Sequence, residues 1–293
     1  MASILVTGTG RGIGFATALV LGRAGHTVYA TMRDPDRSPE LQQVAEREGL
    51  QIKVSAMDVD SDVSVRVSIR SIQAHGPIDV LVNNAGIERR GSVEELDLSQ
   101  FRAVMETNYF GALRCIQAVL PEMRSRRNGC IINVSSVAGR VSSPPLTPYA
   151  ATKFALEALT EGLAQEVKMS NIRVAIVEPG IIDTDMARNV ANETTQSNYP
   201  QGRRMSDLFA VVLQQATPPE VVGRKILEIV ESGTWKLRHP VGPDAEGYLQ
   251  WRASMSDEEW IERGAADDET WYANIKATFG IDARPRALRK QQS

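Results

Sequence analysis

A tyrosine and a lysine stand four residues apart in the stretch TPYAATKFALEAL, as Tyr149 and Lys153. Four residues make just over one turn of an α-helix, so both side chains would lie on one helical face. A neighbouring cation favours the phenolate form of a tyrosine, whose ordinary pKa is about 10. The pair has the chemistry of a tuned acid–base group, although a surface pair without function has the same spacing.

A serine and an asparagine extend this set. The stretch IINVSSVAG places Ser135 and Ser136 at the end of a β-rich run, where adjacent side chains point to opposite faces of a sheet. Asn108 lies in METNYFGAL, inside a predicted helix, where asparagine is locally unfavourable and invites either a functional or a structural reason. Reduction of a carbonyl by hydride transfer needs a proton donor and a hydrogen-bond donor at the oxygen, which these residue types supply.

The elements that must position these residues alternate between short β-rich runs and longer amphipathic stretches. Apolar strands separated by helices predict a parallel sheet covered on both faces, and right-handed crossovers make it a Rossmann-type, doubly wound α/β fold of about seven strands. Ligands of such sheets bind beyond the carboxyl ends of the strands. The predicted strands are 3–7, 26–31, 51–56, 78–82, 130–135, 172–177 and 234–241, and the predicted helices 12–24, 39–48, 61–74, 99–126 and 149–169.

Two segments interrupt this alternation. Residues 183–213 form a polar insertion rich in asparagine and glutamine, of the kind that often closes over a substrate. From Asp244 onward the chain is aromatic and acidic, and a capping box begins at Ser256. We predict one domain, with a catalytic part at 1–243 that includes a substrate lid at 183–213, and a helical C-terminal extension at 244–293.

The composition limits the classes of partner. A net charge of −3 over 293 residues provides no field for nucleic acid or an anionic membrane. Cys115 and Cys130 form no CxxC or Cys/His cluster, so we expect neither a metal site nor a disulfide framework. No apolar run approaches the roughly twenty residues that span a bilayer, and strand-like sequence from Ile4 leaves no room for a signal peptide. We therefore expect a cytoplasmic enzyme or binding protein.

A glycine-rich loop, TGTGRGIG at residues 7–14, follows the first predicted strand. It departs from the GxGxxG fingerprint, because the sixth position counted from Gly8 is Ile13. Glycines let backbone amides approach a pyrophosphate, and the helix that follows directs its N-terminus at the charge. A glycine-rich turn without a ligand is the plainer alternative, which the position between a first strand and a helix disfavours.

Together TGxxxGIG, NNAG at 83–86, the serine after the fifth strand and YxxxK resemble the short-chain dehydrogenase/reductase family over residues 4–186, with weaker agreement to about Val241. The run VYATMRDP and the long tail are similar to its 17β-hydroxysteroid and retinol dehydrogenase-like branch. The resemblance implies an NAD(P)-dependent oxidoreductase of alcohols and carbonyls. It also implies a homodimer or homotetramer formed through the fourth and fifth helices.

The resemblance also implies roles for individual residues. Ser136, the second serine of the family's pattern, would polarise the substrate oxygen while Tyr149 exchanges the proton. Lys153 would modulate the tyrosine and bind the nicotinamide ribose, and Asn108 would hold a water that extends the proton relay. The implied cofactor-binding residues are Gly8, Gly10, Arg11, Gly12, Ile13, Gly14, Arg33, Asp58, Val59, Asn84, Ala85, Gly86, Tyr149, Lys153, Pro179, Gly180, Ile182 and Thr184. Asp58 could instead be a helix N-cap, and NNAG could instead stabilise the sheet.

The second strand bears on the choice of cofactor. NAD enzymes usually place an acidic residue at its end, whereas here it ends on Arg33. A guanidinium supplies the fixed donors that a 2′-phosphate needs, and Arg11 could add a second cation. We predict a preference for NADP(H), with NAD(H) as the alternative if both arginines are only solvated surface residues.

The candidate substrate-binding residues are mostly apolar: Val141, Leu146, Ile181 and Met186, with parts of 183–213. They suggest a small hydrophobic ketone, alcohol, sterol or retinoid-like substrate. Two other functions share much of this sequence pattern. One is a cofactor-binding sensor without catalysis, and the other is an epimerase or dehydratase of nucleotide sugars.

Overall fold

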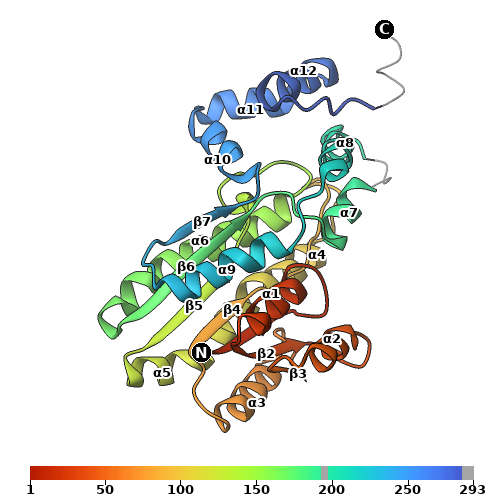
Figure 1. Ribbon diagram of the computed structural model, residues 1–293. Helices are drawn as coiled ribbons and strands as arrows, with labels where there is room; N and C mark the ends of the chain where they lie inside the picture. Colours follow the sequence, from red (N-terminus) through yellow and green to blue (C-terminus); the bar gives the residue numbers. More distant parts are fainter. Residues whose placement is uncertain (193–196, 286–293) are drawn as a thin grey trace.

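The computed structural model describes residues 1–192 and 197–285. These residues form one seven-stranded parallel sheet in the order β3-β2-β1-β4-β5-β6-β7, with helices on both faces (Figure 1). The strands are β1 Ser3–Thr7, β2 Thr27–Met32, β3 Ile52–Ala56, β4 Val80–Asn83, β5 Gly129–Val134, β6 Ile172–Pro179 and β7 Arg238–Val241. The predicted Rossmann-type fold is confirmed.

The sheet separates two hydrophobic cores because successive strand residues point to opposite faces. Ile4 and Val6 lie in one core with helices α1 Gly12–Arg23, α2 Glu40–Glu48 and α9 Glu220–Ser232. Leu5 lies in the other with α3 Asp62–Gln73, α5 Gly111–Arg126 and α6 Thr147–Val167. Burial on both faces explains why the strands read as continuous apolar runs rather than as alternating ones.

The predicted helix 99–126 is interrupted, so its prediction as one helix was wrong in this respect. It consists of α4 Leu98–Met105, a π-helical turn Glu106–Phe110 and α5. π-Helical turns are rare and frequent at functional sites. The turn carries Asn108, the asparagine whose place inside a helix was unfavourable.

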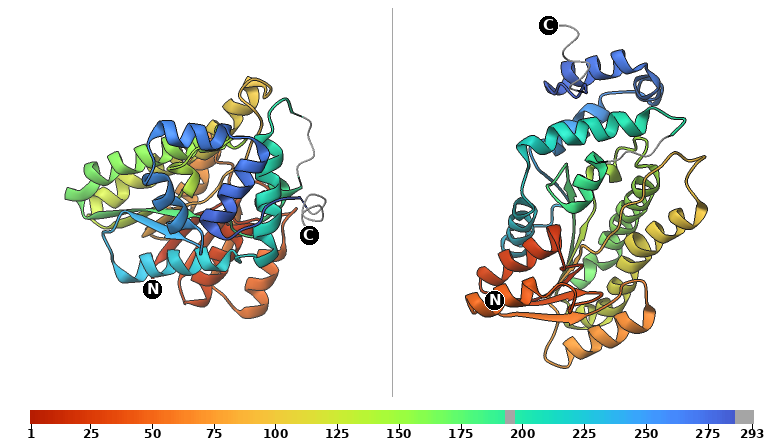
Figure 2. Two further views of the ribbon diagram at one scale, coloured as in Figure 1. Left: turned by 90° about the horizontal axis from the view of Figure 1, so that it is seen from above. Right: turned by 90° about the vertical axis from the view of Figure 1, so that its right-hand side faces the viewer.

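Two segments after β6, the described parts of the predicted lid and of the C-terminal extension, lie over the carboxyl edge of the sheet (Figure 2). The predicted lid contains α7 Asp185–Ala191 and α8 Gln201–Val212, and its residues 193–196 lie outside the described residues. The extension contains α10 Ala245–Ala253, α11 Asp257–Ala265 and α12 Asp268–Phe279, with the predicted capping box at Ser256; residues 286–293 lie outside the described part. A small third core joins the extension to α8 through Leu208.

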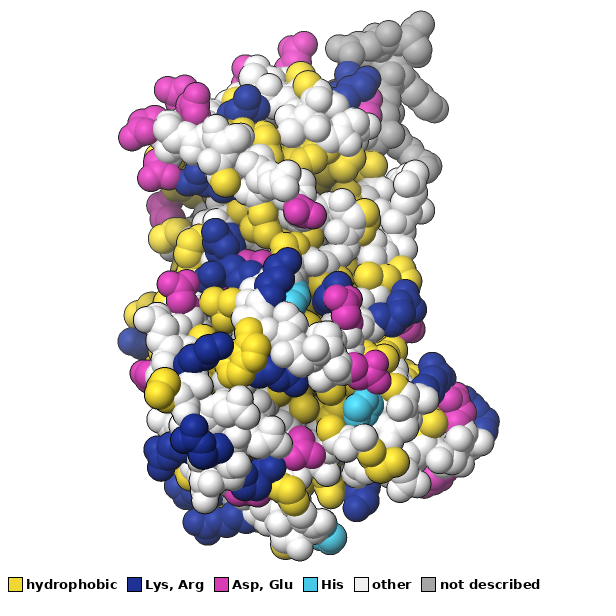
Figure 3. All heavy atoms as spheres, turned by 60° about the vertical axis from the view of Figure 1, so that its left-hand side comes forward, with side chains coloured by type: hydrophobic (Ala, Val, Ile, Leu, Met, Phe, Trp, Pro, Cys, Tyr) yellow, Lys and Arg dark blue, Asp and Glu magenta, His cyan; other side chains and the backbone are white. Residues whose placement is uncertain are grey.

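The surface charge and the cysteines bear on the classes of partner that the composition limits. Acidic and basic side chains are interspersed on the face drawn in Figure 3. Cys115 and Cys130 are buried and free. Within the described residues, no helix is long and apolar enough to cross a membrane, and no three His, Cys, Asp or Glu side chains converge as a metal site.

Candidate active site

A cavity of about 1060 Å³ runs along the carboxyl ends of the strands and is lined by every predicted site residue except Asn108. We call its two parts the dinucleotide end, formed by the glycine loop 7–14, the loops after β2 and β3 and the NNAG stretch, and the substrate end, formed by 141–146, α8 and the extension. Ser136, Tyr149 and Lys153 line the cavity between them.

The glycine loop is held by backbone contacts that only glycine allows. Gly8 and Gly12 have left-handed backbones, with φ of 72° and 58°. A Cβ on Gly8 would lie 2.7 Å from the Ala85 Cα, and one on Gly14 would overlap the Gly8 carbonyl oxygen and the Asn84 amide. The loop therefore packs against the NNAG stretch without room for side chains.

Asn84 fastens this packing. Its Nδ2 donates to the carbonyl oxygens of Thr7 (2.8 Å) and Gly8 (3.1 Å). The Thr7 hydroxyl accepts from the backbone N–H groups of Asn84 and Ala85, both at 3.0 Å. The alternative reading of NNAG as a structural element therefore applies to the Asn84 side chain, while the stretch still lines the cavity.

The dinucleotide end fits a pyrophosphate. Helix α1 begins at Gly12 with no side-chain cap and no acidic residue in its first turn, so the N–H groups of Gly12, Ile13 and Gly14 are left for an anion in the cavity. Gly10 also lines this part of the cavity. The glycine loop would hold the phosphates, and the NNAG stretch would lie beside the ribose.

Two arginines at this end, Arg33 and Arg11, are the predicted contacts of the 2′-phosphate. Arg33 is exposed and lines the cavity as expected. Arg11 also lines it, but its guanidinium lies 3.4 Å from the Asp185 carboxylate at the start of α7. Arg37, which the sequence reasoning missed, lines the cavity and pairs with Asp34 at 3.2 Å. Arg37 thus neutralises Asp34, the residue that follows Arg33 in the chain.

Asp58 and Val59 follow β3. The alternative reading of Asp58 as a helix N-cap was wrong, because Ser61 caps α3 by accepting from the Ser64 N–H. The Asp58 carboxylate instead accepts from the Asp60 N–H at 3.1 Å and lines the cavity. Val59 is buried and fills the space beside Gly111.

The three candidate catalytic side chains meet in the middle of the cavity. Tyr149 lies in the first turn of α6, just after Thr147 and Pro148, and the Lys153 Nζ is 5.5 Å from its ring centroid. Lys153 is buried and donates to the Val134 carbonyl oxygen at 2.8 Å. The Ser136 hydroxyl, after β5, lies near the Tyr149 phenol and acts to lower its pKa. The predicted common face of Tyr149 and Lys153 is present.

Their protonation differs from the sequence-based expectation of a tyrosine favoured as phenolate. Burial raises the pKa of Tyr149 to about 12, against the opposite effect of the Ser136 hydroxyl. Burial likewise lowers the pKa of Lys153 to about 8. The expectation failed for the protein alone because desolvation disfavours both charges, and the Glu88 carboxylate raises the pKa of Tyr149 further.

Asn108 lies under the cavity floor, with 1% of its surface exposed. Its Oδ1 accepts from the Ile87 N–H at 2.8 Å, and its Nδ2 donates to the Ile87 carbonyl (2.9 Å) and to the Thr152 hydroxyl (3.0 Å). Both amide hydrogens are thus used. The side chain links the loop that follows NNAG to α6, and the role of Asn108 as a water anchor stays a prediction.

The nicotinamide-side residues are arranged around a residue that the sequence reasoning missed. The Asp244 carboxylate accepts from the Ile181 N–H at 2.8 Å and lies so close to Gly180 that a Cβ there would overlap it. Pro179 and Ile182 line the same region, and Thr184 caps α7. Asp244 thus ties the first residue of the extension to the end of β6.

The substrate end contains the four predicted residues and many that were not predicted. Val141, Leu146, Ile181 and Met186 all line it. Phe209 of α8 also lines it, within the predicted wall segment 183–213. The walls that were not predicted come from the extension and are largely aromatic: Tyr248, Trp251, Trp260, Trp271 and Phe279. Tyr248 and Ser143 share a hydrogen bond of 3.2 Å, and the Trp260 indole donates to the Ser142 carbonyl at 3.1 Å. The only signal for these walls was the aromatic composition of the tail.

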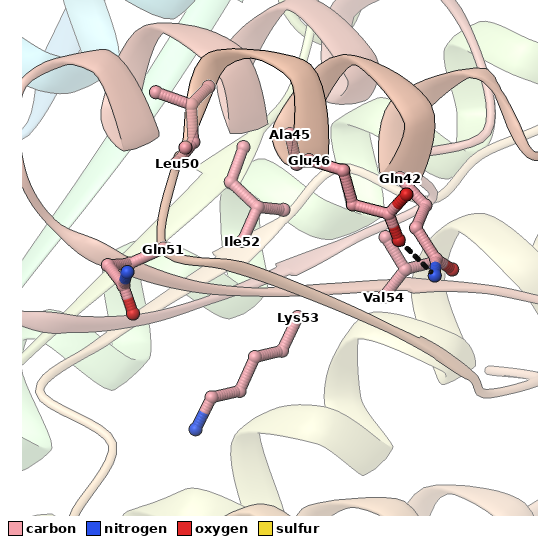
Figure 4. A pocket seen from close by; sticks show the side chains of 9 residues that line it. Gln42, Ala45, Glu46, Leu50, Gln51, Ile52, Lys53 and Val54 are labelled. Atoms are coloured by element: carbon pink, nitrogen blue, oxygen red, sulfur yellow. Dashed lines mark hydrogen bonds between the residues drawn. The ribbon is translucent and has the colours of Figure 1, made fainter.

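A second hollow lies at the outer edge of the sheet, between α2 and β3 (Figure 4). On the α2 side of it, Gln42 donates to Glu46, one turn further along the helix, at 2.8 Å. None of the predicted site residues lines it.

Comparison with known proteins places this geometry in context. Residues 2–195 match the family described as short chain dehydrogenase. Oxidoreductase BOA17 of Botryotinia fuckeliana is 34% identical over 270 residues, which cover 89% of this chain and 97% of that protein. Retinol dehydrogenase 8 of Bos taurus is 39% identical over 202 residues, covering 68% of this chain and 64% of that protein.

A solved structure shares the architecture. The gluconate 5-dehydrogenase of Burkholderia cenocepacia, crystallised with NADP and tartrate, is 26% identical and superposes with a TM-score of 0.73. The match covers 85% of this chain and 95% of that one.

Proposed function

This chain belongs to the short-chain dehydrogenase/reductase family, and from that membership we propose an NADP(H)-dependent enzyme that interconverts a secondary alcohol with a ketone or aldehyde of a hydrophobic small molecule. The family makes it an NAD(P)-dependent oxidoreductase. The preference for NADP(H) and the class of substrate are our proposals.

One observation carries the proposal: the Tyr149 phenol lies beside Lys153 and lines, with Ser136, the cavity where a glycine-built dinucleotide end meets an apolar substrate end. A bound nicotinamide cofactor would supply or accept the hydride there. The candidate site residues would have the roles that the family resemblance implies, and the Asn108 side chain would also join Ile87 to α6.

The protein's own groups suit the reduction direction at neutral pH. With its pKa near 12, Tyr149 carries the proton that the carbonyl oxygen must receive. The Ser136 hydroxyl donates to the Pro179 carbonyl over a long 3.4 Å, so it can turn to donate to a substrate oxygen instead. For alcohol oxidation the phenol must first lose its proton, which the positive charge of Lys153 favours.

The NADP(H) preference is supported by the charges after β2. Arg33 lines the dinucleotide end, and Asp34, which follows it in the chain, is paired with Arg37. A 2′-phosphate would meet the Arg33 guanidinium there. Ser38 lines the same place and offers a further donor.

The hydrophobic substrate class is supported by the aromatic walls of the substrate end. One relative is named retinol dehydrogenase 8, after an apolar alcohol. We extend that class of substrate to this chain. We also retain residues 183–213 as a lid, 1–243 as the catalytic part, and a homodimer or homotetramer, to which the exposed Phe110 and Phe154 would contribute apolar contacts.

Turnover of a panel of hydrophobic ketones, followed by NADPH absorbance, tests the proposal. We expect oxidation of NADPH with one or more of them, and slower turnover with NADH. NADPH binding without oxidation across a broad panel would favour a cofactor sensor. Conversion of a nucleotide sugar without net cofactor consumption would favour an epimerase.

A further inference from the structure

Two buried carboxyl groups lie behind the candidate catalytic lysine, and the proposed chemistry does not use them. Glu157 follows Lys153 by four residues on α6, so it extends the stripe of Tyr149 and Lys153 by one more turn. It is 4% exposed. Glu178, in β6, is 1% exposed.

The basic groups around the two carboxyls come from three other segments. The Arg238 Nε of β7 donates to Glu157 at 3.0 Å and lies 4.0 Å from Glu178. Arg140, just after the turn 137–139, lies 3.7 Å from Glu178 with half of its side chain exposed, and Lys236, before β7, acts from farther away. On α6 itself the exposed Glu161 takes a second bond from Arg238, at 2.7 Å. Arg238 is thus shared among three carboxylates.

The pair is incompletely satisfied. Within the described residues, Glu157 Oε1, Glu178 Oε1 and the Ser135 hydroxyl are buried without a hydrogen-bond partner. A Cβ on Gly139 would lie 2.6 Å from the Ser135 Oγ and 3.2 Å from the Glu157 Oε1, so these two oxygens border the same small space. Two ionised carboxylates in such a place are costly, and a proton on one of them relieves the cost.

We propose that Glu178 holds a proton that lets the two carboxyl groups lie together, and that Glu157, ionised, is a positioning residue that keeps Lys153 protonated. This inference rests on the proposed function for the role of Lys153. Burial, with Glu157 as the second cause, raises the pKa of Glu178 to about 7. Burial lowers the pKa of Lys153, and Glu157 opposes that change.

The consequence concerns the positive charge of the Lys153 ammonium group. Lys153 titrates at about 8, close enough to neutral pH that loss of the Glu157 charge would leave much of it as the neutral amine. Ionisation of Glu178 above pH 7 adds a second negative charge near Glu157, and we expect this charge to extend the protonated range of Lys153 upward by less than Glu157 does. The pair thereby counteracts the loss of the ammonium as pH rises.

The test is the titration of Lys153 itself, which does not depend on turnover. Full-length protein labelled with [ε-¹³C]lysine is titrated by NMR, and Lys153→Met identifies the Lys153 signal. We expect Glu157→Gln to lower the midpoint by about one pH unit, the lower end of the effect of a neighbouring opposite charge. Glu178→Gln, which mimics the protonated acid, should lower it by less.

Glu161→Gln is the matched control, because it removes an exposed carboxylate on the same helix that shares Arg238. Its midpoint should equal that of the unchanged protein. A Lys153 midpoint that is the same in Glu157→Gln, or a larger shift in Glu178→Gln than in Glu157→Gln, overturns the inference. Shifts as expected in a protein that turns over no ketone would refute the proposed function and leave the charge coupling standing.

Discussion

The two ends of the cavity differ in the groups that line them: backbone at one end and side chains at the other. The dinucleotide end is made of backbone: glycines with left-handed φ, the bare N-terminus of α1, and the Asn84 and Thr7 bonds that hold them. The substrate end is made of side chains from segments far apart in the chain, joined by contacts such as that of Tyr248 with Ser143. A backbone-built site tolerates no Cβ, whereas a side-chain-built site can change its lining and keep the fold.

This difference separates the effects expected of substitutions. Changes at the dinucleotide end should affect cofactor affinity or stability whatever the substrate. Changes at the substrate end should alter KM and turnover for the substrate and leave cofactor affinity unchanged. Tyr149 lies where the two ends meet, so its substitution should slow the chemical step and leave the binding of cofactor and substrate nearly unchanged.

The largest effect is expected from Tyr149→Phe. Loss of the proton donor should reduce turnover by about 10²–10⁴-fold, the usual contribution of a general acid–base group. The ring remains, so NADPH affinity measured by fluorescence titration should be nearly unchanged. An equal loss of NADPH binding would mean that the phenol belongs to the dinucleotide end and would break the division.

The next effect is that of Gly14→Ala at the dinucleotide end. The new Cβ would overlap the Gly8 carbonyl oxygen and the Asn84 amide, so loop and helix must move apart. We expect a loss of about 3 kcal/mol in the free energy of unfolding, at the upper end for overpacking, with weaker binding of both NADPH and NADH. Denaturant unfolding and cofactor titration measure the two.

Gly162→Ala is the control for this change. Gly162 lies inside α6, and a Cβ there meets nothing within 4 Å. Alanine should raise the unfolding free energy by about 0.5–1 kcal/mol, because glycine is the poorer helix former. Gly14→Ala protein with the stability and cofactor affinity of the parent would show that side chains, rather than backbone, shape the dinucleotide end.

A smaller, selective effect is expected from Arg33→Ala. Loss of a charge-assisted bond to the 2′-phosphate should weaken NADPH binding by about 1.5–3 kcal/mol and leave NADH binding nearly unchanged. Arg11→Ala should weaken NADPH binding less, since Arg11 is turned toward Asp185. Isothermal titration with both cofactors decides, and equal losses for NADPH and NADH would refute the assignment of Arg33.

The same contrast explains how far the sequence could predict the molecule. The strands and the glycine loop were predictable because local rules govern them: continuous apolar runs, and glycines at a strand–helix junction. Asp244 and Tyr248 were missed because they follow the residues they contact by 63 and 105 positions, and only the folded chain brings them together. Composition signalled an aromatic tail without showing what it faces.

The sequence predicted the positions of the site residues better than their pKa values and hydrogen bonds. The spacing of Tyr149 and Lys153 predicted their shared face, but the pKa of Tyr149 moves upward because burial depends on the whole fold. Asn108 drew attention as an asparagine within a helix, yet the π-helical turn and the link to Ile87 depend on segments twenty or more residues away. Helical periodicity contains no information on desolvation.

The smallest effect, and the one confined to the substrate end, is expected from Tyr248→Phe. The ring keeps its contacts with Trp251 and Phe279, and only the hydrogen bond to Ser143 is lost, at a cost of about 1 kcal/mol. Since that bond fastens the extension to the 141–146 segment, KM for a hydrophobic ketone should rise about fivefold while NADPH affinity stays constant. Tyr199→Phe is the matched control, because the Tyr199 hydroxyl donates to Glu94 and the residue does not line the cavity. A fall in NADPH affinity in Tyr248→Phe would show that the extension also shapes the dinucleotide end, through the Asp244 bond at the end of β6, and the two ends would then have to be treated as one site.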